Sequence, residues 1–196
     1  MKHVTITIKG TKPYLFHAFK VSVLSSKKSL TGKAGDNPDE WRTTIYNDGK
    51  RLYVPGLNML SAIIAGGKYV KVGRGTLSTK VGSAITLLED KIYFNYELPK
   101  DLDDITNESL IDAGQPVYLD IQGVRNPATK GRNARYRLAL KAGWELQFSL
   151  DFDDTIISRE QLDETMQALG KLVGFSDGRT LGFGRFEVTQ FDVKKK

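Results

Sequence analysis

A glycine-rich stretch near the C-terminal end constrains the fold most. It covers residues 174–186, follows a segment with helical apolar spacing and runs into a final apolar stretch. Glycine adopts backbone angles closed to other residues and lets another segment come close. Arg179 and Arg185 lie in this stretch together with Phe175, Phe183 and Phe186. A loop with free amides and two guanidinium groups can hold a phosphate backbone, but a plain helix-to-strand connection fits the same pattern.

Composition narrows the class of protein. The 196 residues carry a net charge of +6, and a basic domain favours a polyanionic partner, most often nucleic acid. Cysteine is absent, so disulfides and thiolate metal sites are excluded, and a reducing, cytoplasmic location is expected. The alternating N-terminus is not a signal peptide, and no apolar run is long enough for a membrane span. We therefore expect no membrane association.

Apolar periodicity divides the chain into strands and helices. Alternation over residues 2–9 predicts a half-buried strand. Ser158 and Gln161 have the spacing of a capping box at the start of a helix. The remaining predicted elements are a strand at 51–54, a helix from Leu57 to Gly66-Gly67 with Leu60, Ile63 and Ile64 inward, a second helical piece within 81–88, strands at 91–97 and within 116–153, and a last strand at 183–193.

This order of elements favours an α+β fold with helices on one face of an antiparallel sheet. The compact form of such an order is a ferredoxin-like or RNA-recognition-type βαββαβ core. We expect a single domain over 1–196, with a long loop at 25–50 and a hairpin-bearing insertion at 98–141. Alternating residues 136–140 and 144–152, separated by Ala142-Gly143, predict a hairpin between those two runs.

The strongest charge feature is a one-signed basic run without an acidic residue from Ile121 through Trp144. It predicts a protruding basic finger that contacts phosphates, with Tyr136 available to stack on a base. The alternative is a hairpin that is basic for solubility. The candidate RNA-binding residues of this finger are Arg125, Lys130, Arg132, Arg135 and Arg137.

A second basic patch follows the helix that begins after Pro55-Gly56. It contains Lys68, Lys71 and Arg74 among glycines. These cations either contact phosphates or neutralise the carbonyl groups at the helix end. Three basic, glycine-bearing segments spread along the chain favour a continuous groove over one local site.

Residues suited to catalysis or metal binding are few. Asp36, in the long loop, and His17 are the candidate catalytic residues, because either can assist the attack of an RNA 2′-hydroxyl on its own phosphodiester. Turn formation explains Asp36 equally well, and packing beside Phe16 explains His17. The acidic residues at 98–114 lack the spacing of a calcium loop. We expect no metal and no cofactor.

Two segments together resemble the RAMP superfamily of CRISPR-associated RNA-binding proteins. Leu52-Tyr53-Val54-Pro55-Gly56 resembles the strand that leads through Pro-Gly into a helix in that superfamily. The stretch from Gly178 to Arg185 is similar to its glycine-rich loop. Superfamily members carry Ser and a basic residue after Pro-Gly, whereas this chain has Leu57-Asn58-Met59.

The resemblance implies a backbone subunit of an antiviral ribonucleoprotein effector that polymerises along guide RNA. Its partners would be single-stranded guide RNA, a target nucleic acid that pairs with the guide, further copies of the chain and other effector subunits. The basic segment at 123–141 would be a thumb-like hairpin that splays bases. Two alternatives stay open: a metal-independent RNA endonuclease of the same superfamily, and a basic structural protein without a nucleic-acid role.

Overall fold

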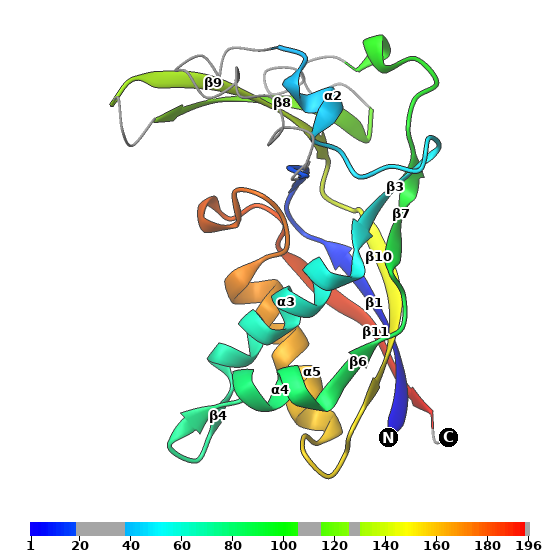
Figure 1. Ribbon diagram of the computed structural model, residues 1–196, viewed down its shortest axis with the longest axis vertical. Coiled ribbons are helices and arrows are strands. Elements are labelled where there is room, and N and C mark those ends of the chain that lie inside the picture. Colours follow the sequence, from blue (N-terminus) through cyan, green and yellow to red (C-terminus); the bar gives the residue numbers. More distant parts are fainter. Residues whose placement is uncertain (19–37, 106–114, 126–129, 195–196) are drawn as a thin grey trace, which may run out of the picture.

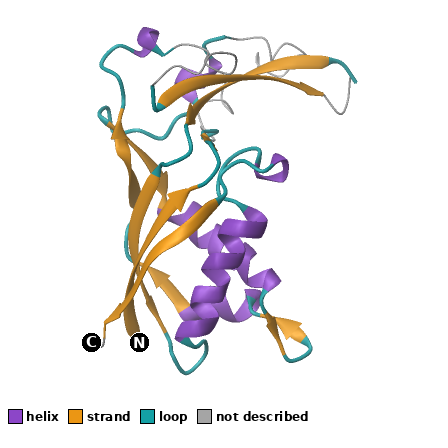
Figure 2. Ribbon diagram, turned by 180° about the vertical axis from the view of Figure 1, so that it is seen from behind, coloured by secondary structure: helices purple, strands orange, loops and turns teal. Residues whose placement is uncertain are grey.

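A computed structural model describes residues 1–18, 38–105, 115–125 and 130–194. An antiparallel main sheet carries helices on one face, and a smaller sheet lies across one end of it (Figures 1 and 2). Within these residues the main sheet consists of β1 (Lys2–Gly10), β3 (Arg51–Pro55), β6 (Ile85–Leu87), β7 (Lys91–Glu97), β10 (Glu145–Phe152) and β11 (Phe186–Lys194).

The strand order of the main sheet is that of a ferredoxin-like fold. The strands lie in the order β11–β1–β10–β7–β3, and β6 pairs with β10. The chain runs from β1 through helix α3 (Gly56–Gly66) to β6 and β7, and then through β10 and helix α5 (Arg159–Ala168) to β11. First and last strands are therefore neighbours, as in a βαββαβ core. The predicted fold class is confirmed.

Strand β1 shows why the sheet buries one face. Val4, Ile6 and Ile8 are fully buried, whereas the threonines between them are partly exposed. Ile6 lies opposite Phe148 on β10 and opposite Phe191 on β11. Successive side chains of a strand point to opposite faces, so this alternation packs one side against the helices.

Helix α5 begins where the sequence predicts. Ser158 and Gln161 form the reciprocal capping box. The last part of the predicted helix widens into a π-helical turn, η3 (Leu169–Val173), which ends at Gly174 with a φ of 79°. Leu162 and Met166 are fully buried in the core between the helices and the main sheet.

Helix α3 packs closely against α5. A Cβ atom on Gly66 would lie 2.7 Å from the carbonyl oxygen of Thr165, so glycine permits the approach. Ile63 is fully buried as predicted, but Met59 faces the core more completely than Leu60 or Ile64, which are only partly buried. The inward face of α3 is thus rotated from the predicted one.

The smaller sheet corrects the predicted hairpin. Within the described residues it consists of β2 (Tyr14–Leu15), β9 (Arg132–Leu140) and β8 (Val117–Arg125), in that order. β8 and β9 form a hairpin, with Val117 opposite Leu140 and Arg125 opposite Arg132. The prediction that 136–140 pairs with 144–152 is wrong, because β10 has β1, β6 and β7 as neighbours in the main sheet.

The other described elements are short. Residues 81–88 do not continue as one helical piece, since helix α4 starts earlier and β6 follows it. No helix among the described residues has the length and apolarity needed to cross a membrane. The short elements are α2 (Glu40–Thr43), η1 (Gly67–Tyr69), β4 (Lys71–Val72), β5 (Gly75–Thr76), α4 (Ser78–Ala84), η2 (Leu102–Asp104) and η4 (Arg179–Leu181).

Candidate nucleic-acid interface

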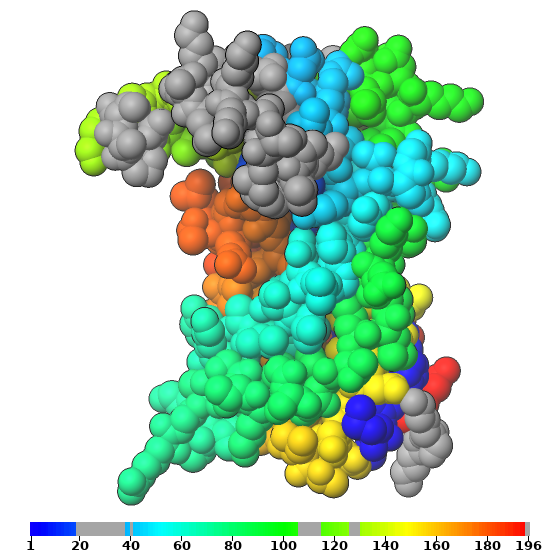
Figure 3. Space-filling model, viewed as in Figure 1, coloured from blue at the N-terminus to red at the C-terminus, as the bar shows by residue number. Residues whose placement is uncertain are grey.

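The glycine-rich loop, α3 and the β8–β9 hairpin converge on one side of the molecule. Figure 3 shows the loop beside α3 and beneath the hairpin. A pocket of about 350 Å³, the central pocket, opens between the loop, α3 and the segment that contains β2. Its lining comes from residues 14–17, Tyr46, the α3 residues Asn58, Ser61 and Ala62, and the loop residues 175–177 and Arg179.

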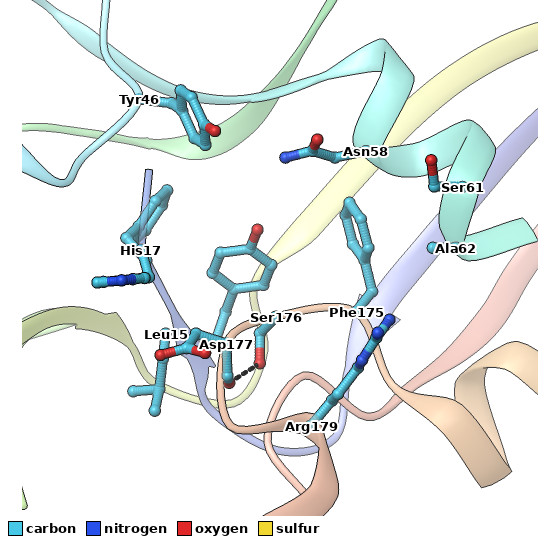
Figure 4. A pocket seen from close by; sticks show the side chains of 12 residues that line it. Leu15, His17, Tyr46, Asn58, Ser61, Ala62, Phe175, Ser176, Asp177 and Arg179 are labelled. Carbon is cyan, nitrogen blue, oxygen red and sulfur yellow. Dashed lines mark hydrogen bonds between the residues drawn. The ribbon is translucent and has the colours of Figure 1, made fainter. Parts of the chain in front are cut away.

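Helix α3 presents a polar stripe toward this side. Asn58 and Ser61 are exposed and line the central pocket (Figure 4). Ala65 and Lys68 follow at helical spacing, with Lys68 on the 3₁₀ turn η1 that directly extends the helix. The stripe therefore leads from a neutral polar end to a cationic end.

A second pocket, the lateral pocket, lies at the cationic end of the stripe. Its volume is about 420 Å³, and Arg179 lines both pockets. Lys68, Arg179 and Arg185 all contribute to the lateral pocket. The two pockets thus meet at Arg179, and together they are called the path, with its positive charge concentrated in the lateral pocket. The full lateral lining is Ala65, Lys68, Tyr69, Leu172, Val173, Arg179, Thr180 and Arg185.

The glycine-rich loop is tied to the protein by its own amides. The Gly184 amide donates to the Pro13 carbonyl at 2.7 Å, and the Asp177 amide donates to the Leu15 carbonyl at 3.1 Å. The Phe175 amide donates to the Gly184 carbonyl at 2.8 Å. These three amides are therefore not available to a phosphate. The loop instead presents side chains, above all the exposed Arg179.

Gly184 shows why this loop needs glycine. Its φ is 66°, and a Cβ atom there would lie 2.7 Å from the backbone of Phe175. A side chain would meet both backbone strain and a close neighbouring segment. The turn at Gly184 thus lets the loop close on itself and hold Arg179 over the junction between the two pockets.

The hairpin is joined to the loop by an ion pair. Arg137 on β9 is mostly buried, and its Nε lies 2.7 Å from Oδ2 of Asp177, at an angle that does not make a hydrogen bond. On the neighbouring strand, Asp120 lies opposite Arg137. Arg137, predicted to contact RNA, therefore has a structural partner inside the protein.

The predicted RNA-binding residues that do not line the lateral pocket fall into two separate groups. Arg125, Lys130 and Arg132 are exposed at the far end of the hairpin, and Arg135 lies partly buried between that end and Arg137. Lys71 and Arg74 are exposed on the small β4–β5 turn, where Lys71 lines a pocket with Asp163 and Glu164 rather than the central path.

The two candidate catalytic residues have different outcomes. Asp36 lies outside the described residues. His17 is exposed and lines the central pocket, so the expectation that it is packed in the core is wrong. Figure 4 shows His17 and Tyr46 on one side of this pocket, and Asn58 and Ser61 on the other. The described residues contain no cluster of three or more acidic, histidine or cysteine side chains suited to a metal ion.

Sequence reasoning missed Tyr14, Tyr46, Asn58 and Ser61 as site residues. Tyr14 and Tyr46 lie in segments whose apolar residues show no clear helical or strand period. The residues that line the pocket with them are distant in sequence. One pattern in the sequence could have identified Asn58 and Ser61. They are polar residues three positions apart in a mostly apolar predicted helix, so they lie on the same face of it. Burial raises the pKa of Tyr14, and the nearby Tyr46 and Asp177 add to this effect. The Tyr14 phenol is therefore neutral across the physiological range.

The comparisons with known proteins support the fold. No protein-family model matches the chain, and no curated protein matches its sequence. Among solved structures, the fold is similar to that of a chain in a cryo-EM structure of the Type III-B Cmr-beta bound to cognate target RNA. The TM-score is 0.51 at 11% sequence identity, and the match covers 99% of this chain. It covers 61% of the Cmr chain, so this chain spans less than two thirds of that neighbour's length. The likeness supports the predicted α+β fold.

Proposed function

We propose that this chain is an RNA-binding backbone subunit of a CRISPR-type ribonucleoprotein effector. The observation that carries the proposal is the path formed by the two pockets, with Arg179 at their junction and the basic hairpin above. The fold adds support, because the similar Cmr chain comes from an assembly bound to target RNA. Single-stranded guide RNA is the partner that this combination of cations, aromatic rings and a narrow path fits best.

The cationic end of the path supplies affinity without sequence preference. Lys68, Arg179 and Arg185 contact successive phosphates, and the released counterions favour binding. The exposed tip of the hairpin adds Arg125 and Arg132, and the hairpin separates neighbouring bases. Most bases stay free to pair with a target nucleic acid, so target choice belongs to base pairing. Copies of the chain, and other effector subunits, then assemble along the same RNA.

Copurification tests this proposal. The chain is expressed alone and purified at low salt, and the 260/280 absorbance ratio, particle size and RNase sensitivity are recorded. A large RNase-sensitive particle is expected. A nucleic-acid-free monomer that also ignores added single-stranded RNA would refute the proposal and favour the structural alternative.

A pair of charge-matched variants sharpens the experiment. The variant with Lys68, Arg179 and Arg185 all changed to alanine should lose the bound RNA. The control changes three exposed lysines away from the path, Lys9, Lys50 and Lys194, and should retain it. Equal loss in both variants would mean that net charge alone, rather than the path, holds the RNA.

The endonuclease alternative keeps one specific observation in its favour. His17 is exposed in the central pocket, within the path proposed for RNA. If the chain cleaves bound RNA without added metal, His17→Ala should abolish cleavage and retain binding. Binding without cleavage by the unchanged chain leaves the non-catalytic proposal standing.

A further inference from the structure

Tyr14 is the centre of an aromatic cluster at the floor of the central pocket. Its ring lies 4.9 Å from the rings of Phe16 and Phe94, and 5.6 Å from that of Trp144, measured between centroids. The residue is only 6% exposed. These contacts involve the ring alone, and phenylalanine would make all of them.

The hydroxyl group of Tyr14 therefore needs another explanation. No hydrogen bond to this hydroxyl is present among the described residues, and the ring contacts do not require it. The two groups that act on it electrostatically, Tyr46 and Asp177, line the central pocket with it. The hydroxyl thus faces the pocket, where a bound molecule can accept or donate a hydrogen bond.

The rest of the pocket suits a flat, neutral, polar-edged ligand. Phe175 and the Tyr14 ring supply apolar walls, and Asn58 offers both an amide donor and a carbonyl acceptor. The carboxylate of Asp177 in the wall disfavours a free anion. Arg179, at the junction with the lateral pocket, adds a positive charge suited to a phosphate.

The size of the pocket agrees with this chemistry. About 350 Å³ accommodates one nucleobase with part of its ribose. Single-stranded RNA is recognised in this manner elsewhere, by bases that leave the stack, pack on aromatic rings and form hydrogen bonds along their edges.

We propose that the central pocket binds one unstacked nucleobase of the RNA, and that Tyr14 and Asn58 select among the four bases. Arg179 holds the phosphate next to that base. The inference rests on the proposed function and goes beyond it, because it makes one nucleotide per subunit subject to selection by the protein itself.

Binding of short single-stranded oligo(A), oligo(C), oligo(U) and alternating (GA) RNAs tests the inference by fluorescence anisotropy. The unchanged chain should prefer one of them. Tyr14→Phe keeps the ring and should lower that preference roughly two- to ten-fold, the range for one lost hydrogen bond. The weakest RNA should bind as before, and the salt dependence of binding should not change. Tyr96→Phe, outside the pocket, is the matched control.

Asn58→Leu provides a second variant that does not risk the core, because Asn58 is exposed. It should reduce the same preference. Arg179→Ala should instead weaken all four RNAs together and reduce the salt dependence. RNA binding with equal affinity for all four, unchanged by both variants, would overturn the inference and leave the proposed function intact. Failure of the unchanged chain to bind any RNA would refute the proposed function itself.

Discussion

At the scale of single residues, Arg137 lies between two carboxylates with different surroundings. Asp177 approaches its Nε from the glycine-rich loop, and Asp120 faces it from the neighbouring strand. Asp120 is 4% exposed, and its Oδ2 has no hydrogen-bond partner in the part of the chain that the structure describes. Arg137 therefore joins the hairpin to the loop, while Asp120 remains incompletely satisfied.

Asp177→Asn should destabilise the fold by about 1 to 3 kcal/mol, because it leaves a mostly buried guanidinium without its counter-charge. Urea denaturation measures the change in the free energy of unfolding. Glu97→Gln is the matched control, since its pair with Lys50 is highly exposed and should contribute less than about 0.5 kcal/mol. Equal effects of the two substitutions would contradict the structural role of the Arg137–Asp177 pair.

Asp120 should make stability fall as pH rises. Burial is the main cause that raises its pKa above the ordinary 3.8, against smaller opposing effects of Gln122 and Arg137. The folded state then holds the proton more tightly than the unfolded state, so ionisation at higher pH weakens folding. Asp120→Asn should gain most over the unchanged chain near neutral pH, and the gain should shrink as pH falls through the raised pKa.

Denaturation measured from about pH 7 down to about pH 4 checks this dependence. Asp153→Asn supplies a control of opposite sign. Hydrogen bonds from the Thr155 hydroxyl and amide lower the pKa of Asp153. That contribution to stability is present above the unfolded pKa and is lost as pH falls through the folded value. A gain from Asp120→Asn that is independent of pH would rule out ionisation of Asp120 as its cause.

At the scale of elements, the glycine-rich loop depends on some glycines more than on others. Gly184→Ala should be strongly destabilising, by more than about 1 kcal/mol, because φ is positive and the Phe175 backbone lies in the way. Gly182 has a φ of 92°, but no heavy atom lies within 4 Å of the position that a Cβ atom would take. Gly182→Ala should therefore cost only the backbone strain. Thermal unfolding of both variants distinguishes the two contributions.

RNA binding by these two variants gives the functional comparison. Gly184→Ala should also weaken RNA binding, since it disturbs the turn that holds Arg179 over the pocket junction. Gly182→Ala should bind RNA more nearly as the unchanged chain does. If both variants unfold and bind alike, closure of the loop on Phe175 is not what fixes its shape.

The elements also show what local pattern can and cannot predict. The capping box of α5 and the alternation of β1 lie within a few residues, and both were predicted correctly. The partner of β9 was not, because alternation identifies a strand without identifying its neighbour. Ala142-Gly143 does form a turn, in which Gly143 has a φ of 101°. The chain uses it to pass from the smaller sheet into the main sheet.

In the candidate site, too, local features were predicted and contacts between distant segments were not. Arg179 and Arg185 were predicted from one local stretch, and the lateral pocket brings them together with Lys68. The ion pair of Arg137 with Asp177 could not be predicted, because it depends on contacts across the fold. The position of the Tyr14 hydroxyl beside the central pocket could not be predicted. The sequence does not show whether a tyrosine hydroxyl faces a pocket or a hydrogen-bond partner within the fold.

At the scale of the whole molecule, three of the cations, Lys68, Arg179 and Arg185, lie together around the lateral pocket. If the path holds RNA phosphates, the dependence of affinity on salt counts those contacts. Single alanine substitutions of Lys68, Arg179 and Arg185 should each reduce the slope of log affinity against log salt by roughly 0.7. Lys194→Ala, at the end of β11, should leave the slope unchanged. Equal slopes for all four variants would place the RNA elsewhere.

The hairpin also has a length that can be compared with that of RNA. Each of its strands has nine residues and so extends about 30 Å. Adding one residue to each strand would move the side chains beyond the insertion to the opposite face of the hairpin. Adding two residues keeps them on the same face and lengthens the hairpin by about 7 Å. That increment matches the rise of roughly two stacked nucleotides. On the proposed function, the length of RNA that the hairpin can span would therefore change in steps of about two nucleotides.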